Sequence, residues 1–290
     1  MKQSQAKKRD NAMTNKILMG LIALVLGLLF LEILIVHSKN EQQKNASNQV
    51  QTARIMANGD LLYHDGLYMS ALQSDGSYDF TENFTYVKPW LQQADLVLGD
   101  FEGTINPYYP LSGYPLFNAP QSVTAAIKDA GYDVMDLAHN HILDSGLEGA
   151  FTTADAFKKV GIDPVGVYEK PVRDKAPLLI KNVNGIKVAI LSYAYGYNGL
   201  ESNLTDKEVA DHLSNLDEKR MKAEIQRAEK EADITVIMPQ MGVEYRLEPT
   251  DEQVKLYHKM IDWGADIIFG GHPHVVEPSE VVKMDGQQNL

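Results

Sequence analysis

The chain has 290 residues, 44% hydrophobic and 23% charged, so it can form a folded core and global disorder is not expected. It has no cysteine, which excludes disulfides, thiolate nucleophiles, cysteine-bound zinc and lipidated cysteine. The net charge of −12 divides into +4 over residues 1–50 and −16 over residues 51–290. Because so acidic a domain repels a phosphate backbone, no nucleic-acid partner is expected.

The first predicted element is a membrane-spanning helix over residues 17–36, where Glu32 is the only charge. A helix of this length spans about 30 Å, the thickness of the hydrocarbon core of a bilayer. Five basic residues lie upstream, and the positive-inside rule keeps that end in the cytoplasm. A cleaved signal peptide is the alternative, but its apolar region is usually about 7–15 residues long and ends at an Ala-x-Ala-like site, which is missing here.

The sequence therefore predicts an uncleaved signal anchor in the cell membrane, with a single pass and the main domain outside the cell. The expected segments are a cytoplasmic basic tail over 1–16, the anchor over 17–36, a polar linker over 37–52 and a single domain over 53–290.

In this domain, short β-branched runs alternate with amphipathic stretches. The expected strands cover 54–58, 95–98, 134–138, 163–167, 187–192, 234–238 and 267–269. The expected helices cover 82–93, 121–130, 147–160, 217–231 and 250–263. Such alternation predicts a largely parallel sheet covered by helices. Asn184-Gly185 lies between two apolar runs and predicts a hairpin, so an antiparallel portion is also expected.

Almost every unusual polar cluster follows the end of an expected strand. The five clusters are 58–60 with His64, 98–103, 137–141 with Asp144, 239–245 and 270–274. Ligands bind at this edge of open α/β sheets. Carboxylates, imidazoles and an Asn from separate strand ends suit two divalent metal ions roughly 3.5–4 Å apart that activate a shared water. Taken singly, each cluster could be a turn, a loop or a helix cap; the joint occurrence in this order is more specific.

The order Gly-Asp, Gly-Asp-x-Glu, Asn-His, Gly-x-Glu-Tyr and Gly-His-x-His resembles the metallophosphoesterase-like (calcineurin-like) superfamily. Within it, DLVLGDFEGTI, DLAHNHILDSG, MGVEY and GGHPHVVEP resemble the CapA family of capsule and poly-γ-glutamate synthesis proteins, over about residues 53–278. The resemblance implies a layered α/β/β/α domain after one N-terminal transmembrane helix. It also implies two divalent metal ions, of manganese, zinc or iron.

Carried over by position, the resemblance implies these metal ligands: Asp60, His64, Asp100, Glu102, Asn140, His141, Gln240, His272 and His274. In the second motif, Glu102 matches the family's glutamate and Asp100 the superfamily's bridging aspartate, so both stay candidates. His64 is a substitute for a missing Asp-x-His histidine or else a surface residue. The catalytic candidates are His141, Asp144 and Glu244.

Two positions depart from the family pattern. His139 replaces an asparagine and adds an imidazole. Gln240 replaces a histidine in the fourth motif. Glutamine is a poor ligand for zinc-like metals, so one metal position is weakened, lost or adapted to a harder ion.

Two functions remain open. One is a divalent-metal-dependent phosphoesterase acting on a phosphorylated cell-envelope substrate. The other is a subunit of a surface-polymer assembly that binds an anionic polymer such as poly-γ-glutamate, together with other polymer-synthesis membrane subunits. A purely structural role without metal is a third reading. The resemblance further implies strands beyond Leu290 and a Ser-Leu-Gly-Asn-Phe-like motif, so a C-terminally truncated fragment or an unusually short member is expected.

Overall fold

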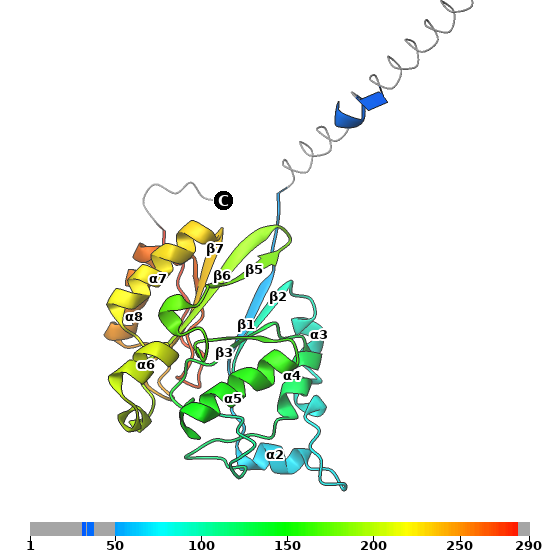
Figure 1. Ribbon diagram of the computed structural model, residues 1–290, viewed down its shortest axis with the longest axis vertical. Helices are drawn as coiled ribbons and strands as arrows, with labels where there is room; N and C mark the ends of the chain where they lie inside the picture. Colours follow the sequence, from blue (N-terminus) through cyan, green and yellow to red (C-terminus); the bar gives the residue numbers. More distant parts are fainter. Residues whose placement is uncertain (1–30, 33, 38–49, 284–290) are drawn as a thin grey trace, which may run out of the picture. The chain divides into compact units, whose positions relative to one another are not determined.

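The computed structural model describes residues 31–32, 34–37 and 50–283 (Figure 1). Residues 31–32 and 34–37 are helical. None of the helices in these described ranges has both the length and the apolar character needed to cross a membrane. Most of the span expected over 17–36 lies outside the described residues, as do the basic tail, most of the linker and residues 284–290.

From Thr52 onward the chain forms one compact unit that contains two four-stranded sheets. The first sheet is parallel throughout and consists of β1 (Ile55–Asp60), β2 (Leu96–Asp100), β3 (Val134–Asp136) and β4 (Asp163–Val165). The second consists of β5 (Leu179–Val183), β6 (Ile186–Ala194), β7 (Ile234–Gln240) and β8 (Ile267–Ile268). In it, β5 and β6 form the expected antiparallel hairpin, and the other pairs are parallel. The expected α/β class with parallel sheets is confirmed.

The helices of this unit are α2 (Asp65–Ala71), α3 (Lys88–Leu91), α4 (Val123–Ala130), α5 (Gly146–Lys159), α6 (Asp206–His212), α7 (Glu218–Glu231) and α8 (Asp251–Trp263). The prediction of one helix over 82–93 is wrong, because a 3₁₀ turn over Thr81–Phe84 is followed by the short α3. Pro89 lacks an N–H group and so cannot continue a helix from the preceding turn, although it can stand in the first turn of a new one. The sequence analysis missed α2 and α6.

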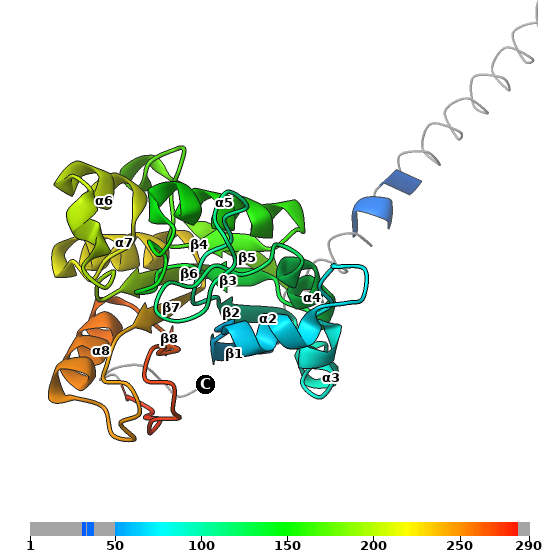
Figure 2. The same cartoon turned by 90° about the horizontal axis from the view of Figure 1, so that it is seen from below.

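Three apolar layers separate the sheets and helices. Along β6, Val188 and Ile190 pack between the two sheets, whereas Ala189 and Leu191 pack against α7 and α8. This alternation follows from the two-residue period of a strand. On the first sheet, Val97 faces the core that contains α4 and α5. Figure 2 shows α7 and α8 on one side of the paired sheets and α4 on the other, so the order is helix, sheet, sheet, helix.

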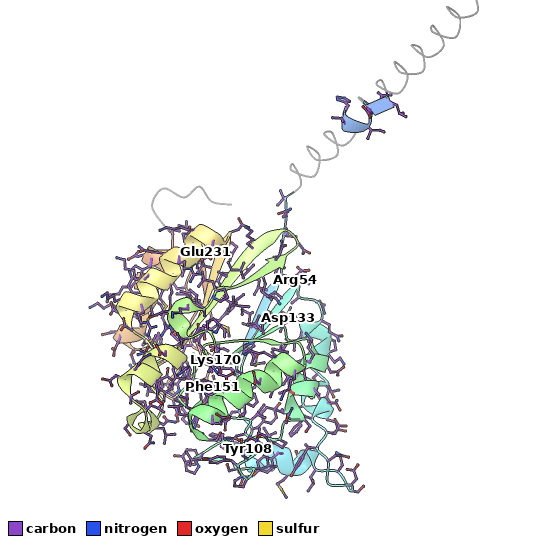
Figure 3. All side chains as sticks on the ribbon, in the orientation of Figure 1. Arg54, Tyr108, Asp133, Phe151, Lys170 and Glu231 are labelled. Carbon is purple, nitrogen blue, oxygen red and sulfur yellow. The ribbon has the colours of Figure 1, made fainter. Side chains whose placement is uncertain are left out.

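The loops that follow the parallel strands of the first sheet gather at one end of the unit. Arg54 and Asp133 precede β1 and β3, whereas Tyr108 follows β2. Figure 3 shows the first two at one end and Tyr108 at the opposite end. The polar clusters that follow these strands are therefore brought together at the end marked by Tyr108.

Candidate metal centre

Three aspartates end three neighbouring strands in register. Asp60 of β1 pairs with Asp100 of β2, and Asp100 pairs with Asp136 of β3. A bulge between Ala57 and Asp60 brings the first pair into line. Because a slip of one residue would turn each carboxylate to the other face, the apolar residues of β2 and β3 fix this arrangement. The sequence analysis missed Asp136, since the strand expected over 134–138 continued past it.

Asp60, Glu102 and His274 form the centre of the site. Each offers a ligand atom, and these three atoms lie within 4.8 Å of one another. His274 Nδ1 lies 2.8 Å from Asp60 Oδ2, and Glu102 is only 1% exposed. Carboxylate oxygen and imidazole nitrogen atoms at this spacing are a donor set for a divalent transition metal ion.

The loop that carries the two last histidines is held close to the carboxylates. His272 and His274 have φ values of 91° and 55°, a region that side chains other than glycine rarely adopt. The backbone N–H of His272 donates to Asp60 Oδ1 over 3.3 Å. A Cβ atom at Gly271 would lie 2.9 Å from Asp100 Oδ2 and 3.2 Å from Asp60 Oδ1, so this close approach requires glycine.

The carboxylates affect one another's ionisation. Burial opposes ionisation of Asp60, but the hydrogen bond and charge of His274 outweigh burial and lower its pKa. Burial raises the pKa of Asp100 well above its usual range, and the nearby Asp136 and Asp60 raise it further. Burial and the charge of Asp60 raise the pKa of Glu102 to about 8. Burial likewise raises the pKa of Asp136 to about 8. His274, whose hydrogen bond to Asp60 raises its own pKa, is the positively charged partner that the structure shows beside these carboxylates.

His141 and Asp144 form a separate pair beside this centre. Asp144 Oδ2 lies 2.7 Å from His141 Nδ1 and also accepts a hydrogen bond from the backbone N–H of Phe117 over 2.6 Å. The other ring nitrogen, Nε2, lies 3.7 Å from Glu102 Oε1. Burial raises the pKa of Asp144. The Phe117 ring packs edge-on against the His141 imidazole, so the imidazole is held from two sides.

Both polar atoms of the Gln240 side chain form hydrogen bonds with Asn140. Gln240 Oε1 accepts from the backbone N–H of Asn140 over 2.9 Å, and Gln240 Nε2 donates to Asn140 Oδ1 over 2.9 Å. Asn140 Nδ2 donates to Asn198 Oδ1 over 3.3 Å. Asn198 lies in the loop after β6, and no motif in the sequence indicated its role.

Two further imidazoles are buried at this edge. His139 is fully buried, and burial followed by the charge of His141 lowers its pKa to about 3. His272 is 5% exposed, and burial lowers its pKa. Its Nδ1 has no hydrogen-bond partner within residues 50–283, and its ring packs against Tyr195 with centroids 4.7 Å apart. Both imidazoles are therefore held in neutral form, as metal ligation requires.

Two predicted site residues lie outside the buried group. His64 is exposed, precedes α2 and packs edge-on against Phe117 with ring centroids 4.8 Å apart. It is not in the group formed by Asp60, Glu102 and His274. Glu244 is also exposed, although its charge raises the pKa of Glu102.

The raised pKa of Asp136 predicts how the stability of the metal-free chain depends on pH. In the folded state this carboxyl keeps its proton up to about pH 8, whereas in the unfolded state it loses it near its ordinary pKa of 3.8. Its contribution to stability is therefore fully present below about pH 4 and is lost as the pH rises through about 8. We expect the free energy of unfolding to fall over this range by on the order of a few kcal/mol.

We expect Asp136→Asn, which keeps the shape but cannot ionise, to flatten this fall. Denaturant unfolding of the chelator-treated full chain at several pH values measures the effect. Asp129→Asn, at a carboxylate whose side chain is 55% exposed, is the control that leaves the fall unchanged. Equal pH profiles for Asp136→Asn and the wild type would contradict the assignment.

Comparison with known proteins places the chain in a family. Residues 54–288 match the family described as bacterial capsule synthesis protein PGA_cap. The capsule biosynthesis protein CapA of Bacillus anthracis is 33% identical over 209 residues, which cover 69% of this chain and 50% of that protein. The PGA biosynthesis protein CapA of Bacillus subtilis (strain 168) is 30% identical over 277 residues, 94% of this chain and 70% of that protein.

A solved structure from Staphylococcus aureus, provisionally named a 5′-nucleotidase and in complex with alpha-ketoglutarate, is 14% identical with a TM-score of 0.48. The match covers 77% of this chain and 46% of that one. Among the sequence relatives, the match spans half the length of the Bacillus anthracis protein. On the match over residues 54–288, the chain belongs to the PGA_cap family of bacterial capsule synthesis proteins.

Proposed function

We propose that this chain takes part in surface-polymer synthesis as a divalent-metal-dependent phosphoesterase that acts on a phosphorylated component of the cell envelope. The observation that carries the proposal is the convergence of four carboxylates, those of the buried Asp100, Glu102 and Asp136 and that of Asp60, whose side chain is 5% exposed. Within residues 50–283, neither a lysine nor an arginine forms an ion pair with any of them. A cluster this poor in positive charge is a binding site for cations.

The donor atoms fit a divalent transition metal ion. Asp100 Oδ1, Glu102 Oε2 and His272 Nδ1 are buried and have no hydrogen-bond partner among the described residues. A buried polar atom without a partner costs roughly 1–3 kcal/mol, which coordination to a cation would offset. Asp60, Glu102 and His274 would hold the ion. When bound, it supplies Lewis acidity at a phosphoryl oxygen and lowers the pKa of a coordinated water.

His141 is suited to protonate the oxygen of the leaving group. Asp144 Oδ2, 2.7 Å away, accepts the hydrogen on His141 Nδ1, which directs Nε2 toward Glu102 and the centre. An imidazole held in this way donates its Nε2 proton as a general acid. Asp144 acts through His141 as a positioning residue.

Exposed side chains at the edge of the site are proposed to contact the substrate. Tyr245 is 72% exposed and packs against His274 with ring centroids 5.8 Å apart, and its neighbour Glu244 is exposed as well. Glu244 raises the pKa of both His272 and His274, so its charge acts on the site. We assign Glu244 to orienting the substrate at the entrance.

A second candidate is polymer binding without hydrolysis. The Bacillus subtilis relative is named for PGA biosynthesis, and a relative from Mycobacterium tuberculosis (strain CDC 1551 / Oshkosh) is named a polyglutamine synthesis accessory protein. The charge of −16 over residues 51–290 would repel an anionic polymer. Metal ions that bridge carboxylates of the chain and carboxylates of the polymer would remove this repulsion. In that role the chain would act with other membrane subunits of polymer synthesis.

We also propose that residues 17–36 anchor the chain in the cell membrane with the compact unit outside. The long apolar run, in which Glu32 is the only charge, and the basic residues before it support this topology. Because the chain has no cysteine, a single cysteine introduced by substitution is a unique labelling site that can test the topology. We expect a membrane-impermeant thiol reagent to label Ser74→Cys in intact cells and Ser4→Cys only after lysis. Labelling of Ser4→Cys in intact cells would contradict the topology.

For the hydrolytic reaction, we expect the metal-loaded full chain to cleave p-nitrophenyl phosphate mono- or diesters faster than the metal ion alone. His141→Ala should lower kcat by about 10²–10⁴-fold, because the proton donor is lost. Asp144→Asn should also lower it, because Nδ1 loses its carboxylate acceptor.

His258→Ala is the matched control, since His258 lies on α8 with its side chain 46% exposed and pairs with Glu280. It should leave the rate unchanged. If a metal-loaded wild type showed no hydrolysis above that of the metal ion, the enzyme proposal would fail. Polymer binding would then be the better account.

A further inference from the structure

The Asn140–Gln240 pair occupies positions from which a second metal ion would take ligands. Gln240 ends β7 and Asn140 follows β3, so the pair joins the two sheets at the edge that holds the carboxylates. Both side chains are buried, Gln240 at 0% and Asn140 at 2% exposure. Neither amide can turn toward solvent for another partner.

The direction of this contact is fixed by a backbone group. The N–H of Asn140 can only donate, so the atom of Gln240 that faces it over 2.9 Å must be the oxygen. Gln240 Nε2 therefore faces Asn140 Oδ1, also over 2.9 Å. This places Asn140 Nδ2 on the other side, where it donates to Asn198 Oδ1 over 3.3 Å.

As a result, each amide oxygen already accepts one hydrogen bond and keeps one further lone pair. Gln240 Oε1 accepts a backbone hydrogen bond, and Asn140 Oδ1 accepts one from an NH₂ group whose hydrogens carry partial positive charge. A cation is attracted by free oxygen lone pairs and repelled by such hydrogens. A metal ion that approached either oxygen would lie beside these hydrogens and would compete with buried hydrogen bonds, each expensive to leave unmade.

The centre at Asp60, Glu102 and His274 differs in this respect. Its three ligand atoms lie within 4.8 Å of one another, and Glu102 Oε2 has no hydrogen-bond partner. His274 Nδ1 lies 2.8 Å from Asp60 Oδ2, and the His272 N–H donates to Asp60 Oδ1 over 3.3 Å. An ionised carboxylate has further lone pairs for a cation, and a deprotonated imidazole offers its ring nitrogen. This donor set offers charged carboxylates to a cation, whereas Asn140 and Gln240 offer neutral amide oxygens that already accept hydrogen bonds.

We infer that this chain holds a single divalent metal ion, at Asp60, Glu102 and His274, and that the Asn140–Gln240 pair takes the place of a second. The inference rests on the proposed function, since it specifies the metal content of the same site. Gln240 sets the number of metal ions. A histidine at this position would offer a ring nitrogen as a ligand and would lack the Nε2 hydrogen bond to Asn140 Oδ1.

The test is the metal stoichiometry of the purified full chain. The protein is stripped with a chelator, loaded with Mn²⁺, desalted and analysed by elemental mass spectrometry together with electron paramagnetic resonance. We expect about one Mn²⁺ per chain and the spectrum of an isolated ion. Gln240→His should raise the content about twofold and give an exchange-coupled pair.

Gln240→Leu is the matched variant, because it removes the amide without adding a ligand and should leave about one ion per chain. About two coupled ions in the wild type would overturn the inference and leave the proposed metal-dependent function intact. No bound metal in the folded wild type would overturn the proposed function itself. One ion in both the wild type and a folded Gln240→His variant would overturn the role of Gln240.

Thermal unfolding confirms that each variant is folded. If Gln240→His fails to fold, the Mn²⁺ content and the spectrum of the wild type still decide between one isolated ion and a coupled pair.

Discussion

Mutual repulsion among buried carboxylates is the constraint on which the rest of this structure depends. Asp60, Asp100 and Asp136 end three parallel strands in register, so the pairing that stabilises the sheet also places their charges side by side. Glu102 adds a fourth, and burial raises its pKa to about 8. A hydrophobic core cannot hold these groups ionised without compensation. These carboxylates therefore need protons or a metal ion to neutralise their charge.

The second sheet supplies the groups that complement this cluster. β7 ends in Gln240, which holds Asn140, and the loop after β8 brings His272 and His274 to Asp60. The two histidines adopt left-handed backbone conformations, and Gly271 allows the loop to pass close to the carboxylates. Strain of this kind, about 1–3 kcal/mol per residue, persists where the surroundings fix the conformation, as at functional sites. The sheet-on-sheet core, with Leu98 and Ile190 in its middle layer, keeps the two halves together.

Much of this arrangement could be predicted from local sequence. The apolar strands followed by Asp60 and Asp100, and the hairpin at Asn184-Gly185, follow from patterns within about ten residues. What could not be predicted depends on partners distant in sequence. Asp136 was not recognised as a site residue because β3 ends two residues before the expected strand end. The contact of Gln240 with Asn140 joins the end of β7 to the loop after β3, which belongs to the other sheet. The exposure of His64 likewise depends on the packing of its ring against Phe117.

The most direct test of the central claim is the number of protons released when the metal binds. Mn²⁺ is titrated into the metal-free full chain at pH 7 by calorimetry, in two buffers with different enthalpies of ionisation. Because Glu102 and Asp136 have pKa values of about 8, they carry protons at this pH without metal. A cation should displace about one proton or more from this cluster. Binding without proton release, or no binding at all, would contradict the account.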